Sequence, residues 1–244
     1  MTGAVQNVAV ITGGNQGIGA AVAALMLEQG YTVVSLGLEL PQFEHPKLHG
    51  EVVDLLDACA TERAAERIAR AYGVTHLIHN AGQIWPNLLE DAKPSDITGL
   101  AQLHLGSALS LLQAFLPNMK AAQFGRVIFN SSRASLGVPT RTAYSATKAG
   151  IVGMARTWAL ELAAHGITVN VVAPGPILTD NFWDLVPKGS QQEQAIAARI
   201  PVGRVGTVDD VARAFMFFAA PEASFVTGQT LYVCGGASIG AMSL

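Results

Sequence analysis

Short apolar runs alternate along this chain with longer segments whose apolar residues recur at helical spacing. The apolar runs predict strands at residues 8–11, 31–36, 51–53, 75–78, 126–129, 167–172 and 231–233. The periodic segments predict helices at residues 20–29, 58–72, 95–119, 142–164 and 211–219. Strands that alternate with helices are typical of an α/β fold. The pattern therefore predicts one domain over residues 1–244, with a doubly wound, mostly parallel, seven-stranded sheet that carries helices on both faces.

The composition fits such a domain and argues against several other classes of protein. With 244 residues, 50% of them hydrophobic, and a mean hydropathy of +0.34, the chain can bury a large core. It has no uncharged apolar run of about 18 residues and no basic segment followed by an apolar core, so we expect neither a membrane span nor a signal peptide. A net charge of −3 gives no electrostatic case for nucleic acid. Cys59 and Cys234 offer no disulfide framework or metal-ligand spacing, which favours a cytoplasmic location and no metal.

A glycine-rich segment follows the first predicted strand directly. It reads Thr12-Gly13-Gly14-Asn15-Gln16-Gly17-Ile18-Gly19 and leads into an alanine-rich helix that we expect to end at Gly30. Strand, glycine loop and helix in this order are typical of a dinucleotide site in a Rossmann fold, because glycines let the backbone approach a pyrophosphate at the positive end of the helix. The alternative is a glycine-rich turn that binds nothing.

A tyrosine and a lysine stand four residues apart in a predicted helix. Residues at this spacing share one helix face, so Tyr144 and Lys148 share one electrostatic environment. A phenol with a pKa near 10 exchanges protons poorly at neutral pH, and a nearby cation lowers that pKa. The pair Ser131-Ser132, about a dozen residues upstream, offers a hydroxyl to the same oxygen. Such a pair also occurs by chance in many helices, so its meaning depends on the rest of the chain.

The ordered motifs of the whole chain resemble those of the short-chain dehydrogenase/reductase family. They are Thr12-Gly13-x3-Gly17-x-Gly19, His79-Asn80-Ala81-Gly82, Asn130-Ser131-Ser132, Tyr144-x3-Lys148, Asn170-x3-Pro174-Gly175, Thr227-Gly228-Gln229 and Gly235-Gly236. The resemblance implies an NAD(P)-dependent oxidoreductase that transfers hydride between the nicotinamide and a secondary alcohol or ketone. It also implies a homotetramer. A catalytically weak cofactor-binding regulator of the same fold is the alternative, although such proteins usually lack the tyrosine or the lysine.

The same resemblance assigns roles to individual residues. Tyr144 is the expected acid/base, Lys148 lowers its pKa and holds the cofactor ribose, and Ser132 binds the substrate oxygen, with Ser131 as the second choice. The residues expected to bind the cofactor are Gly13, Asn15, Gln16, Gly17, Ile18, Gly19, Asp54, Leu55, Asn80, Ala81, Gly82, Tyr144, Lys148, Pro174, Gly175, Ile177 and Thr179. Most of them follow predicted strands, and ligands of such sheets bind at the carboxyl ends of the strands. A solvated loop acid is the other interpretation of Asp54.

The segment Leu103-His104-Leu105-Gly106 departs from the family pattern. Many members have an asparagine at the position of His104, where it anchors a water in a proton relay from the lysine. A neutral imidazole can both donate and accept, so His104 is a candidate for the same role. It could also titrate near neutral pH and make the relay pH-dependent. The alternative is a histidine that only fills the core.

The choices of cofactor and substrate rest on weaker signals. The end of the second predicted strand reads Gly37-Leu38-Glu39, with no cation to receive a 2′-phosphate, so NAD is modestly favoured over NADP. Residues 181–200, with Phe182, Trp183 and Leu185, fall where the family carries a substrate lid, which suggests a small hydrophobic or cyclic substrate. The aromatic stretch 215–218 is an expected subunit interface or part of the core. Arg133 and Arg141 are candidates for pairing with a substrate carboxylate.

Overall fold

The computed structural model describes residues 7–184 and 186–239. The described residues form one parallel, seven-stranded sheet in the order β3-β2-β1-β4-β5-β6-β7. The strands are β1 (Val8–Thr12), β2 (Thr32–Gly37), β3 (Leu48–Val52), β4 (His76–His79), β5 (Gly125–Asn130), β6 (Ile167–Pro174) and β7 (Thr230–Val233). The strand order reverses between β1 and β4, as in a doubly wound Rossmann fold. The predicted fold class is therefore confirmed.

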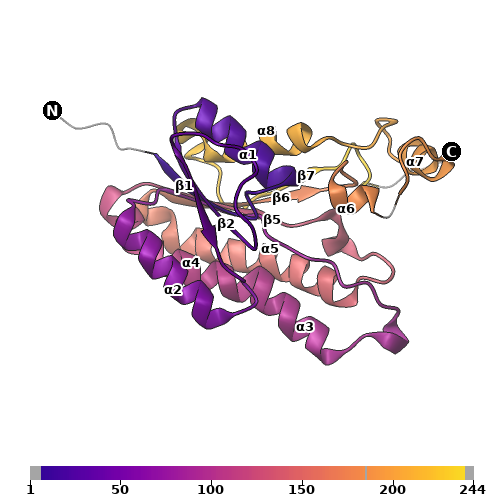
Figure 1. Ribbon diagram of the computed structural model, residues 1–244, viewed down its shortest axis with the longest axis horizontal. Coiled ribbons are helices and arrows are strands. Elements are labelled where there is room, and N and C mark those ends of the chain that lie inside the picture. The colour runs from indigo at the N-terminus through magenta and orange to yellow at the C-terminus, as the bar shows by residue number, and fades with distance from the viewer. Residues whose placement is uncertain (1–6, 185, 240–244) are drawn as a thin grey trace.

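Helices cover both faces of the sheet. The longer ones are α1 (Gly17–Glu28), α2 (Ala58–Ala71), α3 (Pro94–Ala101), α4 (Ser107–Ala122), α5 (Thr142–Leu162) and α8 (Val208–Ala219). One apolar core lies between the sheet and α2, α4 and α5, and a second lies between the sheet and α1 and α8 (Figure 1). Strands β1 and β2 are buried along their whole length. This double burial explains why their sequences are continuous apolar runs and do not alternate.

Several element boundaries differ from the prediction by one to three residues, and two of the differences have a clear physical cause. The third strand was predicted at 51–53, but β3 spans Leu48–Val52, because its sequence Leu-His-Gly-Glu-Val lacks an apolar run and this edge strand is only partly buried. The helix predicted at 95–119 is composite: α3 continues through a π-helical turn, Gln102–Gly106, into α4. The π turn inserts an extra residue into the helix and lies where π turns frequently do, beside a candidate functional site.

The continuous helical run Pro94–Ala122 is long and apolar enough to cross a membrane, by length and composition alone. Its side chains Leu100, Leu111 and Phe115 are fully buried in the core beneath the sheet, where the run packs against α2 and α5. A core helix of a globular protein passes the same test. The hydropathy of this run is therefore accounted for by its packing against the sheet.

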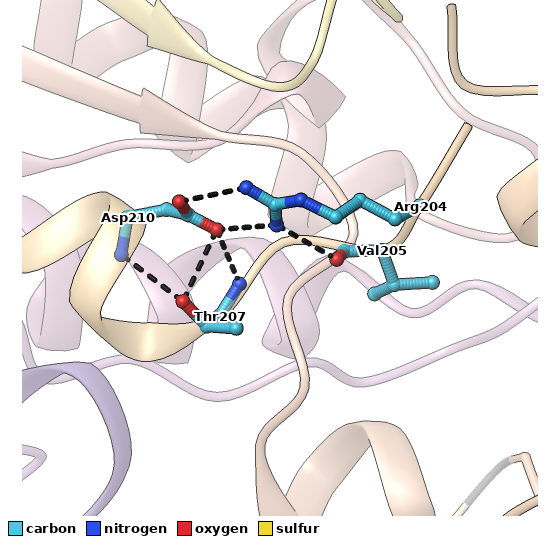
Figure 2. A network of polar contacts seen from close by, with 4 residues as sticks. All are labelled: Arg204, Val205, Thr207 and Asp210. Carbon is cyan, nitrogen blue, oxygen red and sulfur yellow. Dashed lines mark hydrogen bonds and ion pairs between the residues drawn. The ribbon is translucent and has the colours of Figure 1, made fainter. Parts of the chain in front are cut away.

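A capping box at the start of α8 fixes the helix that follows the lid region (Figure 2). The amide of Asp210 donates to Thr207 Oγ1 at 3.2 Å, and the Asp210 carboxylate accepts from the amide of Thr207 at 2.8 Å. Arg204 binds both oxygens of the same carboxylate, at 2.6 and 2.9 Å. These contacts hold the pKa of Asp210 far below its usual range, the bond from Arg204 being the largest cause. Thr207 and Asp210 stand three residues apart in the sequence, the spacing of a capping box.

The predicted lid is a pair of short helices after β6. Helix α6 spans Asp180–Trp183 and α7 spans Gln191–Ala198. Phe182 and Trp183 pack edge to face, with ring centroids 5.2 Å apart. Val186 and Ile200 are buried and anchor the two sides of the segment. Leu185, which the sequence placed in the lid, lies outside the described residues.

Candidate active site

The glycine loop joins β1 to α1 in a conformation that only glycine adopts easily. Gly13 and Gly17 have φ of +65° and +55°, in the left-handed region. A Cβ on Gly19 would lie 2.0 Å from the carbonyl oxygen of Gly13. The Gln16 side chain makes no capping hydrogen bond to the start of α1. The first-turn amides of α1 are therefore available for an anion, and the helix dipole favours one there.

Thr12, the last residue of β1, ties this loop to the end of β4. Its hydroxyl accepts hydrogen bonds from the amides of Asn80 and Ala81, at 2.9 and 3.0 Å. It lies 3.1 Å from His79 Nδ1, and His79 Nε2 lies 3.2 Å from the carbonyl oxygen of Leu103. With both hydroxyl lone pairs used, the Thr12 proton is donated to Nδ1, and His79 carries its own proton on Nε2. Burial lowers the pKa of His79 to about 3, so this side chain is neutral.

A chain of hydrogen bonds continues from Asn80 to the predicted catalytic lysine. The Asn80 amide group donates to the carbonyls of Thr12 and Gly13, and its oxygen accepts from Asn130 Nδ2 at 2.8 Å. The carbonyl oxygen of Asn130 accepts from Lys148 Nζ at 2.7 Å. Burial lowers the pKa of Lys148 to about 7. The lysine is therefore fixed in place and close to exchanging a proton at neutral pH.

Tyr144 lies in the first turn of α5, where the helix dipole stabilises a phenolate. Lys148 Nζ lies over its ring, 5.6 Å from the centroid. Burial raises the pKa of Tyr144, whereas a hydrogen bond from Ser132 and the charge of Arg141 lower it. The sequence argument assigned the lowering to Lys148. In the structure the lowering effects come from Ser132 and Arg141, and burial outweighs them, so the pKa of Tyr144 is raised.

The two serines after β5 have separate surroundings. Ser131 is buried, and its hydroxyl donates to the backbone carbonyl of Lys148 at 2.8 Å. Ser132 caps the following 3₁₀ turn by accepting from the amide of Ala134 at 3.0 Å, and it hydrogen-bonds Tyr144. The geometry therefore assigns Ser131 to holding α5 against β5. It leaves Ser132, the first choice from the sequence, beside the phenol.

His104 occupies the π turn and lies behind Gly82. Its Nδ1 is 2.8 Å from Thr147 Oγ1, whose own proton goes to backbone carbonyls of α5. Nδ1 is therefore the protonated nitrogen, and the buried Nε2 has no partner among the described residues. A Cβ on Gly82 would lie 2.9 Å from that Nε2 and 3.3 Å from Lys148 Nζ. The bare nitrogen thus faces the space next to the ammonium.

The prediction that His104 titrates near neutral pH is wrong. Burial, and after it the nearby charge of Lys148, lower its pKa far below the usual value. The imidazole therefore stays neutral over the whole physiological range. A pH dependence of proton transfer at the site is therefore expected from Lys148 and Tyr144 and not from His104.

Two adjoining cavities collect the predicted residues. The smaller, about 370 Å³, contains Ser132, Tyr144 and Lys148 at one wall. Also lining it are the predicted residues Gly13, Asn15, Gln16, Gly17, Ile18, Asn80, Ala81, Gly82, Pro174, Gly175, Ile177 and Thr179. The larger, about 510 Å³, adds Asp54 and Leu55 and shares the glycine loop. Gly19 and His104 line neither cavity. Gly19 packs against Gly13 and His104 against Gly82, and both of these partners are lining residues.

The shape of this groove fits a dinucleotide. The two cavities meet at the glycine loop, so a pyrophosphate at the start of α1 would place one nucleoside in each. Gly82 keeps the path open in front of Lys148, because any larger side chain would meet His104 and Lys148. Asp54 accepts from the amide of Leu56 at 2.9 Å and so shapes the turn at the far end.

The sequence missed two acids of the groove. Asp180 lines the smaller cavity and Asp184 the larger. Asp180 begins α6 and Asp184 directly follows it, and no local sequence pattern places these two acids at the groove. Of the two arginines that the sequence singled out, Arg141 lines both cavities and Arg133 lines neither. Gln83 and Trp85 also line the larger cavity.

Comparisons with known proteins point to one family. Residues 13–238 match the family described as Enoyl-(Acyl carrier protein) reductase. A 3-oxoacyl-(acyl carrier protein) reductase FabG of Haemophilus influenzae is 37% identical over 237 residues, 94% of this chain and 97% of that protein. The (2S)-(R)-hydroxy(phenyl)methylsuccinyl-CoA dehydrogenase subunit BbsD of Thauera aromatica is 36% identical over 246 residues, 96% of this chain and 98% of that protein.

Solved structures give the same result. A short chain dehydrogenase/reductase family protein superposes with a TM-score of 0.86 at 32% identity, covering 96% of this chain and 97% of the other. A putative NAD(P)-dependent gluconate 5-dehydrogenase of Beutenbergia cavernae with bound NADP has a TM-score of 0.87 at 30% identity, with the same coverage. The comparisons support use of NAD(P) but not the preference for NAD. The chain belongs to the short-chain dehydrogenase/reductase family of NAD(P)-dependent oxidoreductases.

Proposed function

We propose that this enzyme interconverts a ketone and a secondary alcohol on an acyl thioester, with Tyr144 as the acid/base. The observation that carries the proposal is that Ser132, Tyr144 and Lys148 line the same cavity as the glycine loop, with Ser132 hydrogen-bonded to Tyr144 and the Lys148 ammonium over the Tyr144 ring. The names of both curated relatives describe acyl groups carried as thioesters, with a ketone or a hydroxyl. The proposed substrate class, acyl thioesters, is narrower than the small hydrophobic or cyclic substrates expected from the sequence. Reduction of a C=C bond is disfavoured, because enoyl reductases of this fold space tyrosine and lysine more widely.

Each residue of the site has a defined task in this reaction. The bound nicotinamide supplies or accepts the hydride. Ser132 hydrogen-bonds the substrate oxygen, and Tyr144 gives its phenolic proton to that oxygen in the reductive direction. The start of α5 and Arg141 stabilise the phenolate that remains. Lys148, with its pKa near 7, returns a proton to the phenolate.

His104 is proposed to serve the supply of protons to Lys148. Its Nε2 is buried, bare and directed at the space beside the ammonium. A neutral acceptor there can orient a water that donates toward the site. His104→Asn retains an acceptor and should preserve most of the turnover, whereas His104→Leu should reduce kcat roughly tenfold. Equal kcat values for the wild type and His104→Leu would remove His104 from the mechanism.

The choice of cofactor is proposed from the lining of the larger cavity. Gly37, Leu38 and Glu39 lie there at the end of β2, and Arg141 is the only lysine or arginine among its described lining residues. A 2′-phosphate would meet Glu39 with no cation at that end, which favours NAD(H). Solved structures of similar proteins contain NADP, so the choice is tested by comparing kcat/KM for NADH and NADPH. Glu39→Gln should improve kcat/KM for NADPH but not for NADH, and a wild type that prefers NADPH would overturn the choice.

The other expectations also stand as proposals. The chain forms one domain with a lid over residues 181–200 and acts in the cytoplasm as a homotetramer. Phe215 and Phe218 belong to the core, but Phe217 is half exposed, and Leu160 and Phe225 are almost fully exposed. Such apolar side chains on a surface suit a subunit interface. Light scattering during gel filtration measures the mass, and a monomer would refute the proposed assembly.

A turnover assay tests the central proposal. Acetoacetyl-CoA and a panel of simple ketones are offered with NADH and NADPH, and the loss of absorbance at the nicotinamide band is followed. Tyr144→Phe keeps the ring and its packing, so it should still quench NAD(P)H fluorescence while kcat falls about a thousandfold. Turnover of Tyr144→Phe near the wild-type rate would refute the role of the phenol. Cofactor binding with no turnover of any ketone would favour the regulator.

A further inference from the structure

Arg141 lines both cavities of the site and has no carboxylate partner among the described ion pairs. It is the residue before α5, three positions before Tyr144. Its side chain is partly buried. Lys148 is the only other lysine or arginine among the described residues of the two linings, and its ammonium is bound to the Asn130 carbonyl. Of these two cations, Arg141 is the one whose Nε and Nη2 make no hydrogen bond within the described chain.

The backbone holds Arg141 in place at some energetic cost. Thr140 has φ of +64°, a region that threonine rarely adopts, and such strain tends to persist at functional sites. The Thr140 carbonyl accepts from the amide of Asn87 at 3.0 Å, and Asn87 forms an isolated parallel bridge with Arg141. The loop after β4 thus holds the backbone of Arg141, the residue directly before α5, in place.

The guanidinium of Arg141 uses only one of its nitrogens within the described chain. Nη1 donates to Thr140 Oγ1 at 2.7 Å and to the Thr140 carbonyl at 3.3 Å. The described ion pairs are Arg67–Glu51, Arg70–Glu66 and Arg204–Asp210, so Arg141 has no carboxylate partner among them. Asp184 lines the same cavity but is exposed and unpaired with it. Nε and Nη2 remain available, and this edge suits a carboxylate.

We propose that Arg141 binds a carboxylate on the substrate, so that the enzyme selects ketones and alcohols that carry a second, anionic group. The proposal rests on the proposed function and narrows its substrate class. The anionic group would lie at the Arg141 side of the cavity while the reacting oxygen lies between Ser132 and Tyr144. Arg141 is then a specificity residue as well as a stabiliser of the phenolate.

A matched pair of substrates tests this inference. The 3-oxoadipyl thioester of N-acetylcysteamine and its methyl ester have the same reacting ketone and differ in one charge. The wild type should favour the free acid over the ester by about 10- to 100-fold in kcat/KM, the size expected for a charge-assisted hydrogen bond. Arg141→Gln should bring that ratio close to one, and Arg141→Lys should retain part of it. Arg133→Gln, a nearby arginine outside both linings, should leave the ratio unchanged.

Other outcomes overturn the proposal. A wild type without preference for the acid, or an Arg141→Gln variant that keeps the preference, removes the carboxylate contact. Equal losses on both substrates together with weaker NAD(P)H binding would assign Arg141 to the cofactor. If Asp184→Asn changes kcat/KM for the acid and the ester in the same way as Arg141→Gln does, Arg141 and Asp184 instead form an ion pair that closes the lid.

Failure of the reaction itself is separable from failure of the inference. If neither thioester turns over, the proposed function fails, and binding still decides the role of Arg141. Tryptophan fluorescence of the cofactor-bound enzyme gives Kd for the acid and the ester. The acid should bind about 10-fold or more tightly than the ester to the wild type and equally to Arg141→Gln. Equal Kd values in the wild type would refute the contact.

Discussion

Replacing Gly19 by alanine should disable the cofactor groove without touching any group that reacts. The added Cβ would lie 2.0 Å from the Gly13 carbonyl oxygen and 2.6 Å from Asn80 Nδ2. An ordinary carbon–oxygen contact is more than 1 Å longer, about 3.2 Å or more. Because the nearest atom belongs to the backbone, no rotamer change relieves the overlap. The glycine loop and the start of α1 must separate by roughly 1 Å.

This displacement sets the expected magnitudes. Overpacking in a closely packed region costs about 1–3 kcal/mol of unfolding free energy, which lowers Tm by several degrees in a chain of this size. A shift of about 1 Å in a positioning element can reduce catalysis about a hundredfold. We therefore expect Gly19→Ala to weaken NAD(P)H binding at least tenfold and to lower Tm.

A matched glycine on α5 provides the control. A Cβ on Gly153 would meet no atom within 4 Å, and the residue is exposed in a helix interior. Gly153→Ala should therefore raise stability by about 0.5–1 kcal/mol, since alanine is the better helix former. Differential scanning fluorimetry and nicotinamide fluorescence titrations measure both variants. A Gly19→Ala protein with wild-type Tm and wild-type Kd would refute the reasoning.

Three further predictions follow from the polar groups of the structure. Ser132→Ala should lower kcat about a hundredfold with little change in Tm. Ser131→Ala should instead lower the unfolding free energy by about 1 kcal/mol, because its hydrogen bond to α5 is lost. Steady-state rates and melting curves distinguish the two variants, and the reverse pattern would contradict the assignment. The pKa of Lys148 falls from 10.5 to about 7 on folding, so the native state binds fewer protons and stability should rise with pH across that window, by up to about 1.4 kcal/mol per unit. Urea denaturation of the cofactor-free protein at pH 7 and 9 should show this rise in the wild type, and the same slope in Lys148→Met would refute it. Arg126 is 1% exposed and donates to four backbone carbonyls. Arg126→Met should therefore lower the unfolding free energy by about 3 kcal/mol or more. A variant with the Tm of the wild type would show that these hydrogen bonds do not stabilise the fold.

The sheet could be predicted because its strands are buried on both faces. β1 was predicted at 8–11 and spans Val8–Thr12, and the helix predicted at 142–164 is α5, Thr142–Leu162. In both, burial forces a pattern that a local window can detect. The bounds of β3 could not be predicted in this way, because an edge strand with few buried positions has no apolar run to detect.

The site was predictable as a set of residues but not as a set of charge states. The spacing of Tyr144 and Lys148 gave their shared helix face. It did not give the burial that raises the pKa of Tyr144 and lowers those of Lys148 and His104. Burial depends on what packs against α5 from elsewhere in the chain. The π turn that turns His104 inward has no local signature either, since its residues read as an ordinary amphipathic helix.

The line of bonds from Thr12 through Asn80 and Asn130 to Lys148 has a consequence for how a ligand is received. It links the carboxyl ends of β1, β4 and β5 side by side, so the floor of the groove is rigid before anything binds. Little conformational entropy is then lost there on association, and fast binding without an ordering step is expected at the floor. Slow steps should arise at the lid, whose helices have no such ties to the sheet ends among the described residues. The enzyme therefore combines a preformed floor of the groove with a separate proposed lid, and we expect release of product past that lid to limit turnover.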